Sequence, residues 1–221
     1  MAFLSVIQEH FLGFLRATGM TLQLTAVSLV LAVVIGLLFA FMKLSHNLAA
    51  NTVAKGYIGL TRGLPLIVQL MFLYFGIAEL ILLNSFWAGS LALAFHAGGY
   101  VAEIFRGAIQ NVDRGQTEAA RSLGMSSSAS MRLIVLPQAF RRAIPSLGNQ
   151  FIIGLKDSSL VAYLGVPELY SNAMTAAAAN YQPFETYLVA GMYYLVLVVI
   201  FTWLVGKLET RLTPHRQEAT R

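Results

Sequence analysis

Long stretches without a charged residue divide the chain. Four windows contain no Asp, Glu, Lys or Arg: residues 17–42, 63–78, 80–102 and 186–206. A helix needs about 20 apolar residues to cross the roughly 30 Å hydrocarbon core of a bilayer. The windows therefore predict membrane-spanning helices at about residues 18–43, 63–83, 86–110 and 184–206.

A fifth span is expected between residues 144 and 179, where Lys156, Asp157, Pro167 and Glu168 break the apolar pattern. A helix that starts at Ala143 would carry Lys156 and Asp157 towards the bilayer centre, where each charge costs about 2.5–3.5 kcal/mol. If residues 138–155 instead lie along the cytoplasmic interface, the pair stays hydrated and the crossing helix is 158–179. We favour the second arrangement.

This arrangement places residues 165–168, Gly-Val-Pro-Glu, near the middle of the bilayer. Proline lacks the N–H that continues a helix, and a helix broken at mid-depth is typical of transporter substrate sites. No Lys or Arg is then expected near mid-depth. A polar or basic ligand is therefore favoured over an acidic one.

The composition supports a membrane protein. Charged residues make up 11% of the chain and the mean hydropathy is +0.67, whereas soluble domains carry about 25% charged residues. A buried helical core in a soluble protein is the less favoured alternative. The absence of cysteine excludes disulfides and thiolate metal sites. The N-terminus lacks the basic start and cleavage site of a signal peptide, and the dispersed histidines indicate no metal site: His10, His46, His96 and His215.

Lys and Arg set the orientation, because loops rich in these residues stay in the cytoplasm. With the N-terminus outside and five alternating spans, Arg16 is the one basic residue of the 15 in the chain that falls outside. Four or six spans would scatter the others. The sequence thus predicts an all-α membrane protein with five transmembrane helices, N-out and C-in. Because topology explains the basic residues, they do not indicate nucleic-acid binding.

A polar segment interrupts the apolar chain at residues 118–137, within a cytoplasmic region at 114–137. Its first half predicts a short helix with Thr117 as cap and Glu118 in the first turn, and Gly124 permits the left-handed residue that ends it. A second, amphipathic helix follows, with caps available at 126–128, before Pro137 and Pro145 interrupt the chain. An ordinary solvated loop is the alternative to a surface that lipid or a partner covers.

The spacing of this segment resembles the EAA loop of binding-protein-dependent ABC importer permeases. The pattern EAA, then G, then I-x-LP is matched by Glu118, Ala119, Ala120, Gly124, Ile134, Leu136 and Pro137. From about residue 18 to 212 the chain is similar to the polar amino-acid branch of that family, including "YIGLTRGLPLIVQLMFLYFG" and "LKDSSLVAYLGVPEL". The resemblance implies a type I importer permease with the MetI-like fold.

The resemblance also implies a set of partners. Two permease subunits, identical or homologous, form the translocation path in the bacterial cytoplasmic (inner) membrane and contact its lipid, and an extracytoplasmic substrate-binding protein delivers the ligand. The EAA segment acts as a coupling helix on a cytoplasmic ABC ATPase dimer, with Arg121 and Glu118 at the contact. ATP and Mg are bound by that partner. The chain itself lacks a P-loop glycine pattern and a nucleophile–base pair, so it is expected to be non-catalytic and cofactor-free.

Polar residues in the predicted spans are the candidates for ligand binding. Glu168 has no basic residue within a turn, so the ammonium group of an amino acid is one partner for it and a neighbouring helix the other. Ser171, Asn172 and Thr175 lie on or beside the same helix face, although such residues also join transmembrane helices. Gln69 is either a ligand contact or an interhelical hydrogen bond. The resemblance implies no role for His96.

Other transport functions remain as alternatives. A permease of the same fold for another small solute would carry the same coupling segment. A secondary carrier driven by an ion gradient would usually show internal inverted repeats, and none is found in this sequence.

Overall fold

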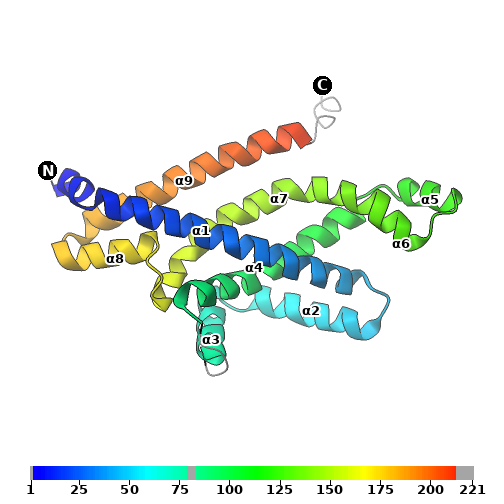
Figure 1. The fold of residues 1–221 in the computed structure, drawn as a ribbon, viewed down its shortest axis with the longest axis horizontal. Coiled ribbons are helices and arrows are strands. Elements are labelled where there is room, and N and C mark those ends of the chain that lie inside the picture. The colour runs from blue at the N-terminus through cyan, green and yellow to red at the C-terminus, as the bar shows by residue number, and fades with distance from the viewer. Residues whose placement is uncertain (1, 79–82, 213–221) are drawn as a thin grey trace.

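The computed structural model describes residues 2–78 and 83–212. These residues are helical apart from short connections (Figure 1), which confirms the all-α prediction. The α-helices are α1 (Ala2–Leu44), α2 (Leu48–Gly63), α3 (Leu66–Ala78), α4 (Ser85–Gln110), α5 (Arg114–Ser122), α6 (Ser127–Ser130), α7 (Leu136–Asp157), α8 (Leu169–Asn180) and α9 (Pro183–Leu212).

The long helix α1 lies against α4 and also packs on α2, α7, α8 and α9. It begins at Ala2, well before the expected residue 18. The charged residues Glu9 and Arg16 precede the charge-free window, but both are exposed on the helix surface and do not interrupt the helix. At about 1.5 Å per residue, its 43 residues extend about 64 Å. It is thus longer than a bilayer core requires.

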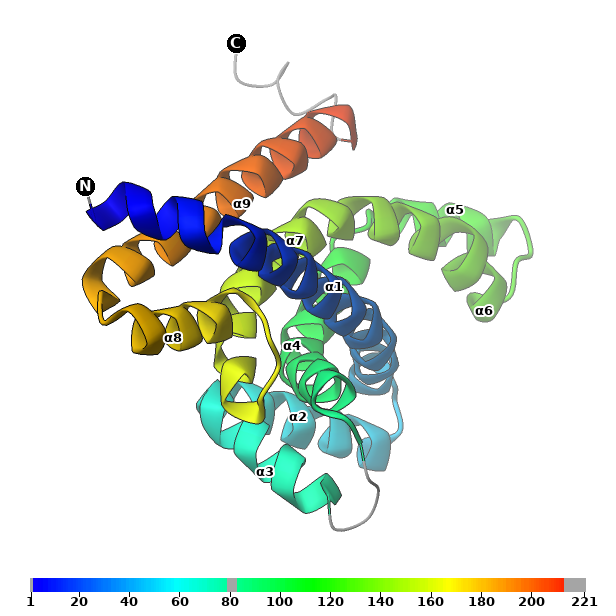
Figure 2. The ribbon, with the colours of Figure 1, turned by 60° about the vertical axis from the view of Figure 1, so that its left-hand side comes forward.

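One helical group brings the two ends of the chain together. Val6 and Phe14 of α1 are buried against Leu169 of α8 and Val189 of α9. Figure 2 shows α8, α9 and the start of α1 on one side of the molecule, and α5 and α6 on the opposite side. The two ends of the bundle are therefore built from different helices.

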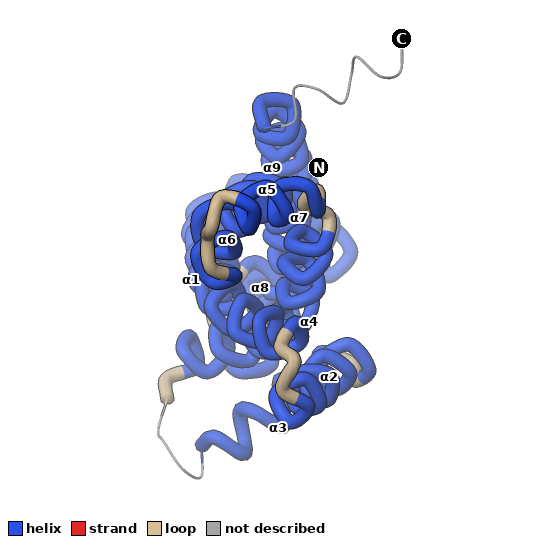
Figure 3. Tube along the Cα trace, turned by 90° about the vertical axis from the view of Figure 1, so that its right-hand side faces the viewer, coloured by secondary structure: helices blue, strands red, loops and turns tan. Residues whose placement is uncertain are grey.

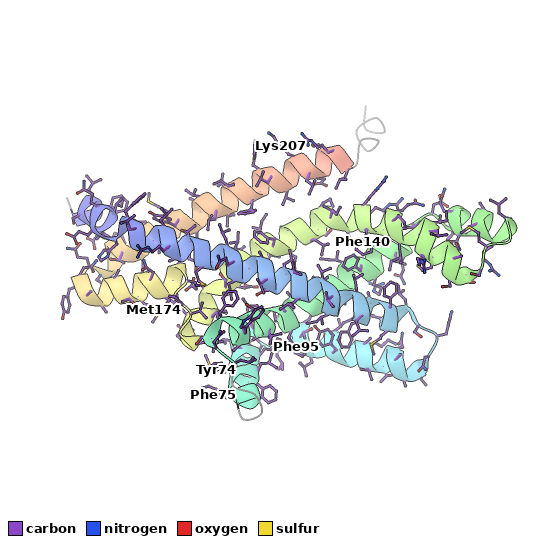
Figure 4. The ribbon with its side chains drawn as sticks, viewed as in Figure 1. Tyr74, Phe75, Phe95, Phe140, Met174 and Lys207 are labelled. Carbon is purple, nitrogen blue, oxygen red and sulfur yellow. The ribbon has the colours of Figure 1, made fainter. Side chains whose placement is uncertain are left out.

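The expected span at 63–83 corresponds to helix α3, with residues 79–82 outside the described part of the chain, and a sharp bend joins α3 to α2, which none of the predicted spans covers. Helices α2 and α3 meet at Pro65 with an angle of 114° between them. Helix α2 lies on α4, where the Tyr57 hydroxyl donates to the Phe95 carbonyl (2.7 Å) and the two rings are in contact. Helix α3 extends away from the bundle and exposes apolar side chains such as Phe75, labelled in Figure 4.

Helix α7 differs from the expectation for residues 138–155. Instead of lying along an interface, it packs inside the bundle against α1, α4 and α9. Ala139, Ala143 and Leu155 are buried, and Phe140, labelled in Figure 4, has its ring against Phe105 of α4. Lys156 and Asp157 therefore stand at the C-terminal end of a long packed helix.

The chain after α7 is not one helix over 158–179 either. A 3-10 helix covers Ser158–Leu164, and Gly165, with φ of +80°, ends it. Helix α8 then begins at Leu169. The predicted break at 165–168 is thus present, but it separates two short elements.

By length and composition, two of the described helices are able to cross a membrane: Phe3–Leu44 and Pro183–Leu212. The bent pair α2–α3 counts as a third if it forms one span. Helices α4 and α9 occupy the residues of the expected spans at 86–110 and 184–206, and of these two α9 is among the helices able to cross a membrane.

Candidate functional site

The polar segment forms a helical hairpin at one end of the molecule (Figure 1), the end that faces the viewer in Figure 3. Its first helix, α5, is capped by Asp113, whose carboxylate accepts from the Gly115 N–H (2.7 Å). The expected cap at Thr117 is therefore wrong by four residues, because the helix starts one turn earlier. Ser126 caps α6 as expected, since its hydroxyl oxygen accepts from the Ala129 N–H.

Gly124 ends α5 in the left-handed conformation, with φ of +84°. The Met125 N–H donates to the Ala120 carbonyl and the Gly124 N–H to the Arg121 carbonyl. These two bonds form the Schellman ending of a helix, in which the left-handed residue is usually glycine. The sequence-based role of this glycine is confirmed.

The second arm of the hairpin continues into α7 without a break. Met131–Val135 form a π-helical turn between α6 and α7. The Leu136 N–H reaches back to the Met131 carbonyl, and Pro137 follows in the first turn of α7, where a missing N–H is tolerated. Helix α7 includes both Pro137 and Pro145, so neither proline ends it. A continuous helical segment joins the hairpin to the bundle interior.

The hairpin presents a mixed surface to its surroundings. Glu118, Ala119 and Arg121 are exposed, whereas Ala120 is buried against the hairpin itself. Leu123 and Leu133 expose 85% and 60% of their surface. The hairpin therefore exposes apolar as well as charged side chains.

Glu168 has no exposed surface and caps α8. Its carboxylate accepts from the N–H groups of Tyr170 (2.9 Å) and Ser171 (2.7 Å) and from the Tyr194 hydroxyl of α9 (2.6 Å). A buried carboxylate is stable when donors surround it, and a carboxylate at a helix N-terminus is favoured by the helix dipole. This geometry supports the role in helix packing, not the ligand contact.

The residues that follow Glu168 on α8 face different surroundings. Asn172 lies over α1, where a side chain on Gly13 would be 3.2 Å from the Asn172 Oδ1 atom. Thr175 is exposed and its hydroxyl donates to the Ser171 carbonyl. Ser171 is half-buried. These side chains do not converge on one pocket.

Gln69 lies at the α2–α3 bend, on an element that makes few contacts with α8. Its Nε2 group donates to the carbonyls of Thr61 and Leu64 (2.9 Å each). Gln69 is buried, with 3% of its surface exposed. Its two hydrogen bonds stabilise the sharp bend. The structure does not bring Gln69 together with Glu168.

A different set of polar groups does converge. A small cavity between α1, α4 and α7 is lined by Thr25, Ser28, His96, Gln150 and Asp157. Its position, beside the central part of α1, is midway along the bundle. In this conformation it has room for water but not for an amino acid.

The polar atoms of this cavity are available for a ligand. The hydroxyls of Thr25 and Ser28 donate to carbonyls of their own helix, so their oxygens remain as acceptors. The His96 Nδ1 atom is buried and has no hydrogen-bond partner among the described residues. Asp157 supplies a carboxylate, the one acidic group in the lining. The unsatisfied His96 nitrogen is one buried polar atom of this lining for which a polar partner would be favourable.

Sequence reasoning missed this cavity because its residues come from three distant segments. Thr25 and Ser28 are spaced to share a face of α1, but they read as ordinary polar residues of a membrane helix. The sequence pattern favours a hydrated position for Asp157 at the cytoplasmic membrane interface. The missed signal is the combination of Asp157 with His96, two ionisable residues in otherwise apolar regions.

Comparison with known proteins decides the family. The model of the "Binding-protein-dependent transport system inner membrane component" family matches residues 32–214. The chain belongs to this permease family. It is accordingly a non-catalytic permease subunit of the inner membrane, and the identification from the EAA segment is confirmed.

Relatives of this permease extend over nearly its whole length. The nopaline transport system permease protein NocM of Agrobacterium fabrum is 36% identical over 96% of this chain and 92% of its own. The arginine permease ArtQ of Bacillus subtilis is 34% identical (90% and 91%), and the glutamine permease GlnP of Escherichia coli 35% identical (90% and 92%).

Solved structures of permeases share the fold. An amino acid ABC transporter with histidines is 40% identical to this permease, with a TM-score of 0.87 over 95% of this chain and 98% of that chain. The inward-facing MetNI methionine transporter is 18% identical, with a TM-score of 0.79 over 93% and 98%. The second likeness concerns the fold alone.

Proposed function

We propose that this permease is the transmembrane half of an ATP-driven amino-acid importer. The observation that carries the proposal is the exposed hairpin α5–α6, which bears the EAA residues and leads through a π-helical turn into α7. Through this hairpin the subunit couples to a cytoplasmic ABC ATPase dimer that binds ATP and Mg. An external substrate-binding protein and a second permease subunit, identical or homologous, complete the transporter.

The proposed topology has five crossings with the N-terminus outside. Helices α1, α4 and α9 cross singly, the bent α2–α3 pair forms the second crossing, and α7 to α8 forms the fourth. The positive residues Lys43, Arg106 and Arg142 then lie at the cytoplasmic end, together with α5 and α6. Glu103 pairs there with Lys43 and Arg106.

Amino-acid transport is supported by the relatives and by the cavity. Proteins related to this chain are named for nopaline, arginine and glutamine, which share an α-ammonium and a carboxylate. Asp157 and the oxygens of Thr25 and Ser28 suit the ammonium, and the Gln150 amide and His96 suit the carboxylate. The ligand enters after the walls part, because the present cavity is too narrow.

A polar or basic amino acid remains the preferred substrate, but the reason is now the carboxylate of Asp157 in the cavity lining. The expected absence of a cation near mid-depth no longer supports it, because the exposed Lys156 stands next to Asp157. Lys156 is adjacent to the cavity but not part of its lining. The one charged acceptor in the lining remains Asp157.

The test is uptake by the whole transporter in proteoliposomes, using labelled arginine, glutamine and histidine as probes. Uptake should need ATP and should persist when ionophores remove the ion gradients, whereas uptake by a secondary carrier would stop. The variant Asp157→Asn should weaken uptake of its best probe about tenfold or more, since bonds to charged groups contribute about 1.5–3 kcal/mol. Asp113→Asn is the matched control, because Asn caps a helix as well as Asp does. Equal uptake by both variants would remove Asp157 from the site.

A further inference from the structure

The cavity between α1, α4 and α7 continues towards the cytoplasmic end as a second hollow. This open groove is lined by Arg62, Tyr100, Glu103, Ser146, Asn149 and Gln150, among others. Gln150 is the residue that lines both hollows. It is 6% exposed, so little of it faces the open side.

The two hollows follow one seam between two helices. On α4, His96 lines the cavity and Tyr100, one turn further, lines the groove. On α7, Gly154 and Asp157 line the cavity and Ser146 lines the groove, again on one helix face. Residues three or four apart share a face of a helix. The seam is therefore a single strip that is closed at the level of Gln150.

Side chains of α4 and α2 support the strip at this level. The Tyr100 ring lies 5.4 Å from the His96 ring, measured between centroids. The Arg62 guanidinium also lies 5.4 Å from the centre of the Tyr100 ring. Tyr100 thus contacts both a cavity residue and a groove residue.

We propose that Gln150 is the gate that closes the cavity on its cytoplasmic side. This rests on the proposed function for the identity of the substrate and for which side of the cavity is cytoplasmic. Movement of the ATPase can reach the gate through one helix, because Gln150 belongs to α7 and α7 is continuous with the coupling hairpin. Pro145, which also lines the groove, stands between them, and a proline inside a helix is a point where it bends.

The gate is tested by chemical access, for which the cysteine-free chain is suited. Ser28→Cys places one thiol in the cavity of the assembled transporter in proteoliposomes. A membrane-impermeant cationic methanethiosulfonate is added from the cytoplasmic side, and modification of this subunit is followed by mass. With Gln150 in place the reaction should be slow. Adding Gln150→Ala should accelerate it about tenfold, which corresponds to a barrier lower by about 1.4 kcal/mol.

Matched variants separate the gate from general loosening. Asn149→Ala changes the groove alone and should leave the rate within about twofold, a difference well below 1 kcal/mol. Gln150→Met, which keeps the length of the side chain, should keep the reaction slow. Should Gln150→Ala fail to assemble, Gln150→Asn replaces it, with a smaller acceleration expected.

Equal acceleration by Asn149→Ala and the short Gln150 variants, or no acceleration by the latter, would overturn the gate. Reagent added from the opposite side should react at a rate that does not depend on residue 150. A failure of the uptake test at Asp157 would remove the ligand assignment and leave this access result unchanged. The two proposals therefore fail separately.

Discussion

At the scale of single residues, Glu168 shows how burial determines the role of a charged group. An isolated carboxylate in an apolar helix predicts a functional contact. In the structure two backbone N–H groups and the Tyr194 hydroxyl surround it. Two of these donors belong to α8. The third, Tyr194, belongs to α9 and lies 26 residues after Glu168 in the chain. A partner at that separation is not visible in the local sequence.

Glu168→Gln should therefore destabilise the subunit. The amide keeps one acceptor oxygen, and its NH2 group faces donors, so at least one buried donor loses its partner at a cost of about 1–3 kcal/mol. The measurement is equilibrium unfolding of the purified complex in detergent. Glu9→Gln makes the same change on an exposed carboxylate and should stay within about 0.5 kcal/mol of the parent. A stable Glu168→Gln protein that no longer transports would restore the ligand role.

At the scale of elements, local chemistry specifies the ends of the hairpin helices, and packing specifies where the long helices lie. Asp113, Gly124 and Ser126 each satisfy or redirect backbone groups within four residues, so their roles follow from nearby sequence. Helix α7 is different, because its place inside the bundle depends on α1, α4 and α9. Its sequence alone was compatible with an interfacial helix.

Gly124→Val should uncouple the ATPase from transport. At φ of +84° a β-branched residue adds about 1 kcal/mol or more of backbone strain, which would displace the tip that carries Leu123. Hydrolysis by the reconstituted transporter, with and without loaded binding protein, measures the coupling. The matched control is Gly124→Asn, since asparagine tolerates the left-handed region. Full coupling in Gly124→Val would contradict the role of this turn.

At the scale of the whole molecule, two ends with different tasks are joined by long helices. One end carries the hairpin, and the other groups α8, α9 and the start of α1 (Figure 2). Many apolar side chains of α9, including Leu195, Val199 and Trp203, remain exposed. In the proposed transporter they face lipid or the second permease.

Orientation is checked by labelling single cysteines with an impermeant reagent. A cysteine at Arg16 should react from the periplasmic side, and cysteines at Lys55 or Arg114 from the cytoplasmic side, because loops rich in positive charge remain inside. Arg216 is expected inside as well; it lies outside the described residues. Labelling of position 114 from the periplasm would overturn the N-out topology.

The sequence by itself determined the family, the apolar helices and the turn chemistry of the hairpin. Those properties depend on composition, on runs of about 20 residues and on groups a few positions apart, all of which a linear pattern contains. The tertiary structure alone decided that Glu168 is a packed cap, that α7 is internal, and that Thr25, His96, Gln150 and Asp157 share a cavity. These features depend on which helix faces meet between segments far apart in the chain, from 26 residues for Glu168 and Tyr194 to more than 100 for Thr25 and Asp157, and no local periodicity encodes that choice.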